Sequence, residues 1–246
     1  MTIYEDLLDL RLHYLAGNIQ QFVAQAESAA MKPIDIITRA VELEQLERSQ
    51  RSIQRRLKEA RLGRFNMMKD FDWNWPKEVD RKVIESLFSC DYVEARQNII
   101  LAGPQGLGKT MIAKNLAQQA AMRCLSVLYT TASAMVIDLG AQENKSSLQR
   151  RLRYYESRDL LVLDEIGYLA FDNRAADFVF EVVNRRYEKG SIIITTNLAF
   201  KDWGQIFPGA PCVTAMIDRL THHAKIIKIT GDSYRLRESK SRKDKT

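Results

Sequence analysis

The sequence predicts an α/β fold in which a parallel five-stranded sheet, flanked by helices, is preceded by a small all-helical N-terminal domain. Two observations predict this fold. From residue 98 onward, short apolar runs rich in β-branched residues alternate with helical segments, a pattern typical of a parallel sheet covered on both faces. Before residue 98 no such run occurs, and apolar residues recur at helical spacing only.

Residues 4 to about 62 are predicted to form helices. Leucines recur at helical spacing in the first helix, at Leu7, Leu8, Leu12 and Leu15. Gly17-Asn18 predicts its end, and Ile19 opens a second short helix. Pro33 is typical of the first turn of a third helix. This helix either runs on, or breaks and resumes, into a basic stretch.

The composition divides the chain into three parts. Residues 1–66 form the helical domain, residues 67–97 a connector, and residues 98–246 the α/β domain. The connector concentrates aromatic residues in Phe71-Asp72-Trp73-Asn74-Trp75-Pro76 and then enters a helix from about Lys77 to Phe88. We interpret these rings as packing between two domains; stacking on nucleic-acid bases is the alternative.

The α/β domain alternates strands and helices. The predicted strands are 98–102, 126–130, 160–164, 191–196 and 225–229. The predicted helices lie near 109–123, 132–157, 174–188 and 213–223.

Composition excludes several classes of protein. The chain has 246 residues, of which 46% are hydrophobic and 28% charged, so it is not a disordered chain. Apolar runs all fall short of the ~18 residues of a membrane span, and the acidic start, Glu5-Asp6, does not resemble a signal peptide. Three widely spaced cysteines, Cys90, Cys124 and Cys212, are typical of reduced thiols. We therefore expect a cytoplasmic protein without membrane contact.

Positive charge gathers in two segments. Between Arg48 and Arg64 seven basic residues stand against one acid, Glu59, and between Arg237 and Lys245 five stand against two. This pattern favours a polyanion as partner, although a solvated helix face and a flexible tail would look the same. The candidate DNA-binding residues are Arg48, Arg51, Arg55, Arg56, Lys58 and Arg61.

A phosphate-binding loop follows the first predicted strand. The string Gly103-Pro104-Gln105-Gly106-Leu107-Gly108-Lys109-Thr110 matches the Walker A motif between a strand and a helix. Glycines let backbone N–H groups turn toward phosphate oxygens, and the helix N-terminus adds further donors. Lys109 is expected to reach the β- and γ-phosphates of ATP, and the Thr110 hydroxyl to bind Mg²⁺.

Two acidic residues end the third predicted strand, Leu160-Leu161-Val162-Leu163-Asp164-Glu165. Open α/β sheets bind ligands at the carboxyl ends of their strands. Asp164 therefore fits the acid that organises Mg²⁺, and Glu165 fits the base that polarises the attacking water. Without the Walker A string, the same pattern would indicate only a strand that meets a polar loop.

The fourth predicted strand also ends in a polar residue, Asn197. Its amide could hold the attacking water against the γ-phosphate, but Asn is also an ordinary turn residue. The strand and its spacing leave both readings open.

Six strings stand out together: Gly103–Thr110, Leu163-Asp164-Glu165-Ile166-Gly167, Thr195-Thr196-Asn197-Leu198, Trp203-Gly204, Ile217-Asp218-Arg219-Leu220 and Gly231-Asp232-Ser233-Tyr234-Arg235. They resemble the IstB-like insertion-sequence ATPases, relatives of the DnaC helicase loader within the AAA+ class. The resemblance covers essentially the whole chain, including the leucine-rich start and Phe71-Asp72-Trp73.

The resemblance implies further residue roles. Asn197 matches the sensor 1 position, Arg219 the arginine finger that completes a neighbouring subunit's site, and Arg235 is a candidate sensor 2 arginine. Arg219 could instead be a surface arginine paired with Asp218. Only 27 residues follow Arg219, too few for the helical lid domain of other AAA+ proteins, and this puts Arg235 in doubt.

The resemblance also implies a function: a transposition helper that hydrolyses ATP, assembles on duplex DNA, selects a target and regulates the transposase of its element. The main alternative is a DnaC-like loader, whose partner is a replicative helicase. A nucleotide-gated DNA-binding scaffold with little turnover and a small-molecule kinase are further alternatives. Glu165 argues against the scaffold, and the two basic segments argue against the kinase.

Overall fold

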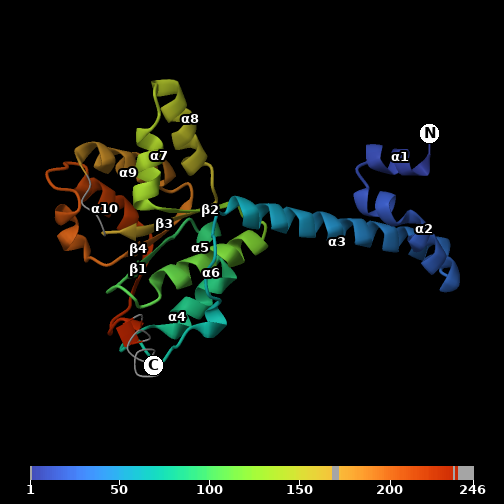
Figure 1. The fold of residues 1–246 in the computed structure, drawn as a ribbon, viewed down its shortest axis with the longest axis horizontal. Coiled ribbons are helices and arrows are strands. Elements are labelled where there is room, and N and C mark those ends of the chain that lie inside the picture. Colours follow the sequence, from blue (N-terminus) through green and yellow to red (C-terminus); the bar gives the residue numbers. More distant parts are fainter. Residues whose placement is uncertain (1, 168–171, 235, 238–246) are drawn as a thin grey trace, which may run out of the picture. The chain divides into compact units, whose positions relative to one another are not determined.

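The computed structural model describes residues 2–167, 172–234 and 236–237. The chain divides into two compact units, Met1–Arg55 and Arg56–Thr246, and Figure 1 traces their elements. The division falls inside one continuous helix, α3 (Pro33–Glu59), and not at residue 66. Residues 56–97 therefore belong to the same unit as the α/β domain.

The first unit is helical, as expected, but its first break lies elsewhere. Helix α1 (Ile3–Asp9) ends before Arg11, whose φ of 58° turns the chain, and α2 (His13–Ser28) then runs straight through Gly17-Asn18. The prediction of a stop at Gly17-Asn18 was wrong. The Asn18 side chain donates to the carbonyl of Tyr14 at 2.8 Å, a bond that is compatible with the helix interior.

A buried acid takes the place of the missing N-cap of α2. The Glu44 carboxylate, on α3, accepts hydrogen bonds from the N–H groups of His13, Tyr14 and Leu15 at 3.1, 2.8 and 3.3 Å. The first N–H groups of a helix have no partner within it, so this carboxylate satisfies them and complements the helix dipole. It fixes α2 against α3 over a small core of Leu7, Leu15, Ala16 and Phe22.

The second unit holds the predicted sheet. Its five strands are all parallel, in the order β2-β3-β4-β1-β5. They are β1 (Asn98–Ala102), β2 (Val127–Thr131), β3 (Leu160–Ile166), β4 (Ser191–Thr196) and β5 (Ala224–Lys228). The predicted parallel five-stranded sheet is therefore confirmed, with strand ends displaced by at most two residues.

Helices cover both faces of this sheet, as Figure 1 shows for α6 and α4 on one side and α7, α8 and α9 on the other. Successive strand residues enter opposite cores: Ile99 and Leu101 one, Ile100 the other. The covering helices are α4 (Arg81–Ser86), α5 (Asp91–Glu94), α6 (Lys109–Met122), α7 (Ala132–Gly140), α8 (Lys145–Glu156), α9 (Asn173–Arg186) and α10 (Val213–His222). Short 3-10 turns lie at Met68–Asp70, Leu87–Ser89 and Phe200–Gln205.

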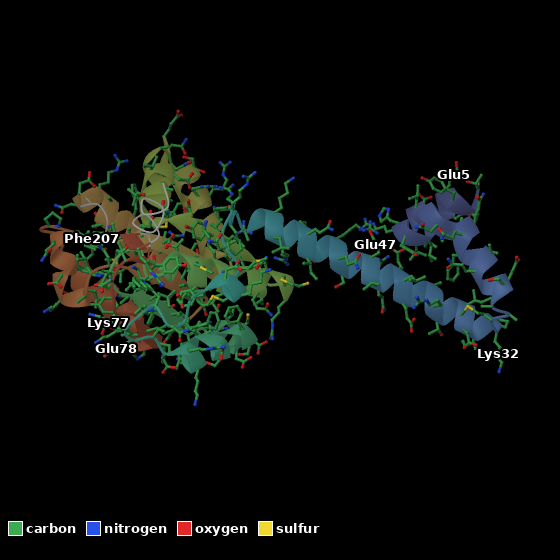
Figure 2. The ribbon with its side chains drawn as sticks, turned by 60° about the horizontal axis from the view of Figure 1, so that its bottom comes forward. Glu5, Lys32, Glu47, Lys77, Glu78 and Phe207 are labelled. Atoms are coloured by element: carbon green, nitrogen blue, oxygen red, sulfur yellow. The ribbon has the colours of Figure 1, made fainter. Side chains whose placement is uncertain are left out.

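Two predicted helices are corrected. The single helix predicted near 132–157 is two, because Asn144 caps a new helix, α8, by a reciprocal pair of hydrogen bonds with Ser147. The helix predicted from Lys77 begins only at Arg81, where Asp80 is the N-cap. Lys77 and Glu78, labelled in Figure 2, instead pair with the backbone of Thr230 beyond β5.

The part of the chain after α10 is short. Its described residues form β5 and a C-terminal segment, and no helical lid domain lies among them. None of the described helices is both long and apolar enough to cross a bilayer.

Candidate nucleotide-binding site

The loop Gly103–Thr110 joins β1 to α6 at the carboxyl edge of the sheet. Gly103, Gly106 and Gly108 have φ values of 156°, 79° and 83°, which side chains rarely tolerate. Space is also closed to a side chain: a Cβ on Gly103 would lie 2.0 Å from the carbonyl oxygen of Ile229, and one on Gly108 2.5 Å from the Phe71 ring. The loop can therefore present backbone N–H groups to an anion, as the motif predicts.

Lys109 opens α6 and is only 5% exposed. Its ammonium donates to the carbonyls of Gly103 and Pro104 at 2.6 and 2.7 Å. A buried ammonium requires such partners. They hold its positive charge at the loop, where phosphates are expected to bind.

Asp164 lies at the carboxyl end of β3 and is 1% exposed. Its Oδ1 accepts from the hydroxyl of Thr110 at 3.1 Å and from that of Thr195, and its Oδ2 accepts from the Tyr129 hydroxyl at 2.5 Å. Burial, followed by the hydrogen bond to Asp164, raises the pKa of Tyr129, so this hydroxyl remains a donor. The fold thus brings together the two oxygen ligands predicted for Mg²⁺, Thr110 and Asp164.

Glu165 differs from its neighbour in exposure and in backbone conformation. It is exposed, whereas Asp164 is buried, and its φ is 64°. The register of β3 and β4 shifts between Leu163 and Ile166, which marks a β-bulge. A non-glycine residue at positive φ in a bulge is uncommon and is often found at functional sites. The carboxylate is left accessible to water at the edge that carries the loop.

Asn197 follows β4 directly and lies at the same edge. Its Oδ1 is buried and has no hydrogen-bond partner among the described residues. It lies next to Gly167, where a Cβ would come within 2.5 Å of it. Buried polar atoms are normally paired, so this amide fits a residue whose partner belongs to the bound reactants.

Arg219 is at the opposite edge of the sheet. It lies on α10 with its guanidinium 5.3 Å from the centroid of the Phe180 ring, and it lines a small cavity with Asn98, the first residue of β1. The five residues of β1 alone separate the two edges by about 16 Å at ~3.3 Å per residue. The structure therefore does not bring Arg219 to the loop of its own chain.

Comparison with known proteins agrees with this geometry. The family of IstB-like ATP binding proteins matches residues 5–242. The chain belongs to this family. It is 36% identical to the ATP-binding protein of insertion sequence IS21 from Pseudomonas aeruginosa, over 94% of this chain and 87% of that one.

Solved structures show that the fold is that of the AAA+ class. DnaI is similar with a TM-score of 0.55 and 20% identity, over 67% of this chain and 90% of that one. The DnaC helicase loader is similar with a TM-score of 0.51 and 15% identity, over 71% and 99%. At these identities the likeness concerns the fold alone. The resemblance to IstB-like ATPases that the motifs predicted is confirmed.

The aromatic connector of this IstB-like protein forms a wall of the site. A cavity of about 290 Å³ beside the loop is lined by Phe71, Trp75 and Tyr234 together with Gly106–Met111. The Trp75 indole donates to the carbonyl of Asp232 at 2.8 Å, and its ring lies 6.0 Å from that of Tyr234. The prediction that these rings pack between two domains was wrong, because they pack inside the second unit. Their spacing in the sequence does not reveal this partner.

Arg235, the candidate sensor 2 residue, lies outside the described residues, as do residues 238–246 of the basic tail. The residues just before it touch the loop. Tyr234 donates its N–H to the carbonyl of Gly106 at 3.0 Å, and Ser233 lies over the same glycine. The chain's C-terminal segment thus reaches the nucleotide site.

The candidate DNA-binding residues fall into two groups. Arg48 and Arg51 both pair with Glu44, at 3.5 and 3.7 Å, and Arg51 also pairs with Glu47 at 3.1 Å (Glu47 is labelled in Figure 2). Glu59 is the one acid inside the stretch, but Glu44 and Glu47, which precede it, neutralise two of its arginines. Among the remaining candidates, Arg55, Lys58 and Arg61 are exposed and Arg56 is partly buried.

A second basic cluster, missed by the sequence reasoning, surrounds Tyr154 on α8. The guanidinium groups of Arg151, Arg158 and Arg61 lie 4.2, 4.6 and 5.8 Å from the centroid of its ring. The sequence predicted Arg61 as a DNA-binding residue from the charge of its own segment. Its position beside Tyr154 is decided by the tertiary structure.

Proposed function

We propose that this IstB-like protein hydrolyses ATP to ADP and phosphate, assembles on duplex DNA, and acts as a transposition helper that selects the target and regulates the transposase. The observation that carries this proposal is the contact between Thr110 and Asp164, with the exposed Glu165 beside them. Residues from two separate motifs meet there, at the edge where α/β sheets bind ligands.

The loop and the cavity beside it suit the two ends of a nucleotide. The triphosphate would lie against the N–H groups of Gly103–Thr110 and the Lys109 ammonium. The base would enter the cavity of Phe71, Trp75 and Tyr234, where flat rings offer stacking surfaces. Arg235 follows Tyr234 in the chain and is retained as a candidate contact to the phosphates.

Thr110 and Asp164 would hold Mg²⁺, because both supply the hard oxygen ligands that this ion prefers. When bound, Mg²⁺ neutralises negative charge on the β- and γ-phosphates. Glu165 accepts a proton from the attacking water, and the Asn197 amide orients that water or the γ-phosphate. This division of work follows from burial, since Asp164 is enclosed and Glu165 is open to solvent.

Arg219 would complete the site of a second copy. It lies at the opposite edge of the sheet from its own loop, so a guanidinium that acts on the γ-phosphate must come from a neighbour. Hydrolysis would then depend on assembly, because charge on the transferring phosphoryl group is stabilised only where two copies meet.

Duplex DNA is the polyanion that this proposal assigns to the basic residues. Arg55, Lys58 and Arg61 are exposed, and Arg61 and Arg158 lie 5.8 and 4.6 Å from the centroid of the Tyr154 ring. Arg151 lies at the same ring but is paired with Asp138. Phosphate contacts of this kind bind largely without regard to sequence. The insertion-sequence relative favours a transposase as protein partner over a replicative helicase, since its identity of 36% is higher than the 15% of the DnaC loader.

Steady-state phosphate release by the purified protein, with and without duplex DNA, tests the proposal. We expect ATP- and Mg²⁺-dependent turnover that DNA stimulates, and none in Glu165→Gln, which still binds ATP. Pull-down against the element's transposase and against a replicative helicase separates the helper from the loader. A parent protein that binds ATP without turnover would support the scaffold alternative.

A further inference from the structure

Two residues of β3 oppose a single residue of β4 at the nucleotide site. Leu163 pairs with Ile194, and Ile166 pairs with Thr196. Asp164 and Glu165 therefore both lie opposite Thr195, which is 1% exposed. A bulge of this kind leaves the ladder of backbone hydrogen bonds locally broken.

The Thr195 hydroxyl fills that break. It accepts the N–H of Glu165 at 2.9 Å and donates to Oδ1 of Asp164. One hydroxyl thus bonds to both acids of the site, through the backbone of one and the carboxylate of the other. A hydroxyl has one proton to donate and lone pairs to accept with, so it can make both bonds at once.

We propose that Thr195 is a positioning residue that holds Glu165 in its bulged, positive-φ conformation and keeps it in register with Asp164. This inference rests on the proposed ATPase function. Glu165 is exposed, and its φ of 64° is unfavourable for a residue with a side chain. The Thr195 hydroxyl accepts the N–H of Glu165, so without that hydroxyl the backbone from which the carboxylate projects loses this support.

Tyr129 provides an internal comparison. Its hydroxyl donates to Oδ2 of Asp164 at 2.5 Å, and no hydrogen bond links it to Glu165 among the described residues. Removing this hydroxyl disturbs the buried carboxylate alone. Removing that of Thr195 disturbs the carboxylate and the backbone of Glu165 together.

The experiment compares Thr195→Val, Thr195→Ser and Tyr129→Phe with the parent protein. Valine keeps the branched shape of threonine and loses the hydroxyl, whereas serine keeps it. Ser191→Ala, at the other end of β4, is the matched control, because it also removes a fully buried hydroxyl, here one that donates to the carbonyl of Tyr92 at 3.0 Å. Each variant is assayed for kcat against Mg²⁺ concentration, for affinity toward a fluorescent non-hydrolysable ATP analogue, and for thermal midpoint.

We expect Thr195→Val to lose about 10- to 100-fold in kcat, as removal of an orienting hydrogen bond typically does, with no recovery at high Mg²⁺. Its analogue affinity should stay within about threefold of the parent, since the loop and Lys109 are untouched. Thr195→Ser should retain most of the activity. Tyr129→Phe should need more Mg²⁺ but recover its kcat once Mg²⁺ is saturating.

Three results would overturn the inference. The first is a kcat of Thr195→Val equal to that of the parent. The second is a loss of kcat in Tyr129→Phe that saturating Mg²⁺ does not correct, and the third is a loss in Ser191→Ala as large as that in Thr195→Val. The parent and Glu165→Gln are measured first. A parent without turnover overturns the proposed ATPase function and the inference together, whereas an active parent with a fully active Thr195→Val overturns the inference alone.

Discussion

The two edges of the sheet carry charge in opposite ways. At the carboxyl end of β3 the acid Asp164 is buried and enclosed by three hydroxyls, with the exposed Glu165 beside it. At the amino edge the buried group is a base, Arg186, with the partly exposed Arg219 beside it. Each edge thus carries a pair of side chains of like sign, one buried and held by the fold and the other partly or fully exposed.

Arg186 shows how a buried cation is tolerated. It is 1% exposed and donates to backbone carbonyls where β3 and β4 begin. Those carbonyls belong to Tyr155, Glu156, Arg158, Asp159 and Ser191. Burial lowers the pKa of its guanidinium to about 10, against the opposing effect of Asp159 and Glu156, so it remains charged at neutral pH. By contrast, the one hydrogen bond described for Arg219 goes to its own helix, at Ala215.

The comparison suggests a rule for charged residues at one edge of the sheet. Exposure, more than position, distinguishes a residue that stabilises the fold from one that can contact another molecule. Arg186 and Arg219 line the same small cavity, yet only the second has a partly exposed side chain. The following predictions test this distinction.

Arg219→Ala should have the largest effect, a loss of about 10³- to 10⁵-fold in turnover, as for arginine fingers in phosphoryl transfer. ATP affinity of a single subunit should change little, because Arg219 lies far from its own loop. Phosphate release measures the turnover, and binding of a non-hydrolysable ATP analogue measures the affinity. Mixing this variant with Glu165→Gln should restore some activity, since a mixed interface can pair an intact finger with an intact base. If demonstrably mixed oligomers recover no activity, Arg219 does not act on the site of a neighbouring subunit.

Arg186→Met should instead act on stability, lowering the free energy of unfolding by about 3 kcal/mol, because it leaves several buried carbonyls without a donor. Chemical denaturation measures the loss. Arg153→Met, an exposed arginine on α8, is the control and should change stability by less than about 0.5 kcal/mol. Equal stability of the two variants would show that the carbonyls at the amino edge find other donors.

Lys109→Ala should weaken ATP binding by about 10- to 150-fold, the effect of losing charge-assisted hydrogen bonds to phosphate. Fluorescent-analogue titration gives the affinity. Lys114→Ala is the control: this residue lies on the same helix, with its ammonium 4.5 Å from the centroid of the Tyr129 ring. Unchanged affinity in Lys109→Ala would contradict the assignment of the loop.

The smallest expected effect is on the salt dependence of DNA binding. It should differ between the basic residues of α3 that are ion-paired and those that are exposed. Arg55→Ala/Lys58→Ala should reduce the slope of log affinity for duplex DNA against log salt by up to about 1.8, or ~0.9 for each lost phosphate contact. Arg48→Ala/Arg51→Ala should reduce it less, because Glu44 and Glu47 already neutralise these side chains. Affinity is measured with a non-hydrolysable ATP analogue at several salt concentrations. Equal slopes for both variants and the parent would indicate that the DNA contacts lie elsewhere, on α8 or in the tail.

Much of the carboxyl edge could be predicted from the sequence. The five parallel strands, the loop Gly103–Thr110 and the acids at the end of β3 follow from local patterns: apolar runs, glycines at fixed spacing and polar residues at strand ends. These patterns arise because each strand buries its own side chains and each turn needs its own backbone conformation. The family followed from the same strings.

Only the tertiary structure decided which distant residues meet. Asp164 bonds to Tyr129 and Thr195, the aromatic connector lines the nucleotide cavity, and Glu44 caps α2 and neutralises two of the predicted DNA-binding arginines. Such pairings depend on strand order and helix packing, which bring together residues far apart in the chain. A hydroxyl, a ring or a carboxylate carries no local signal of its eventual partner, whereas a turn or an apolar strand does.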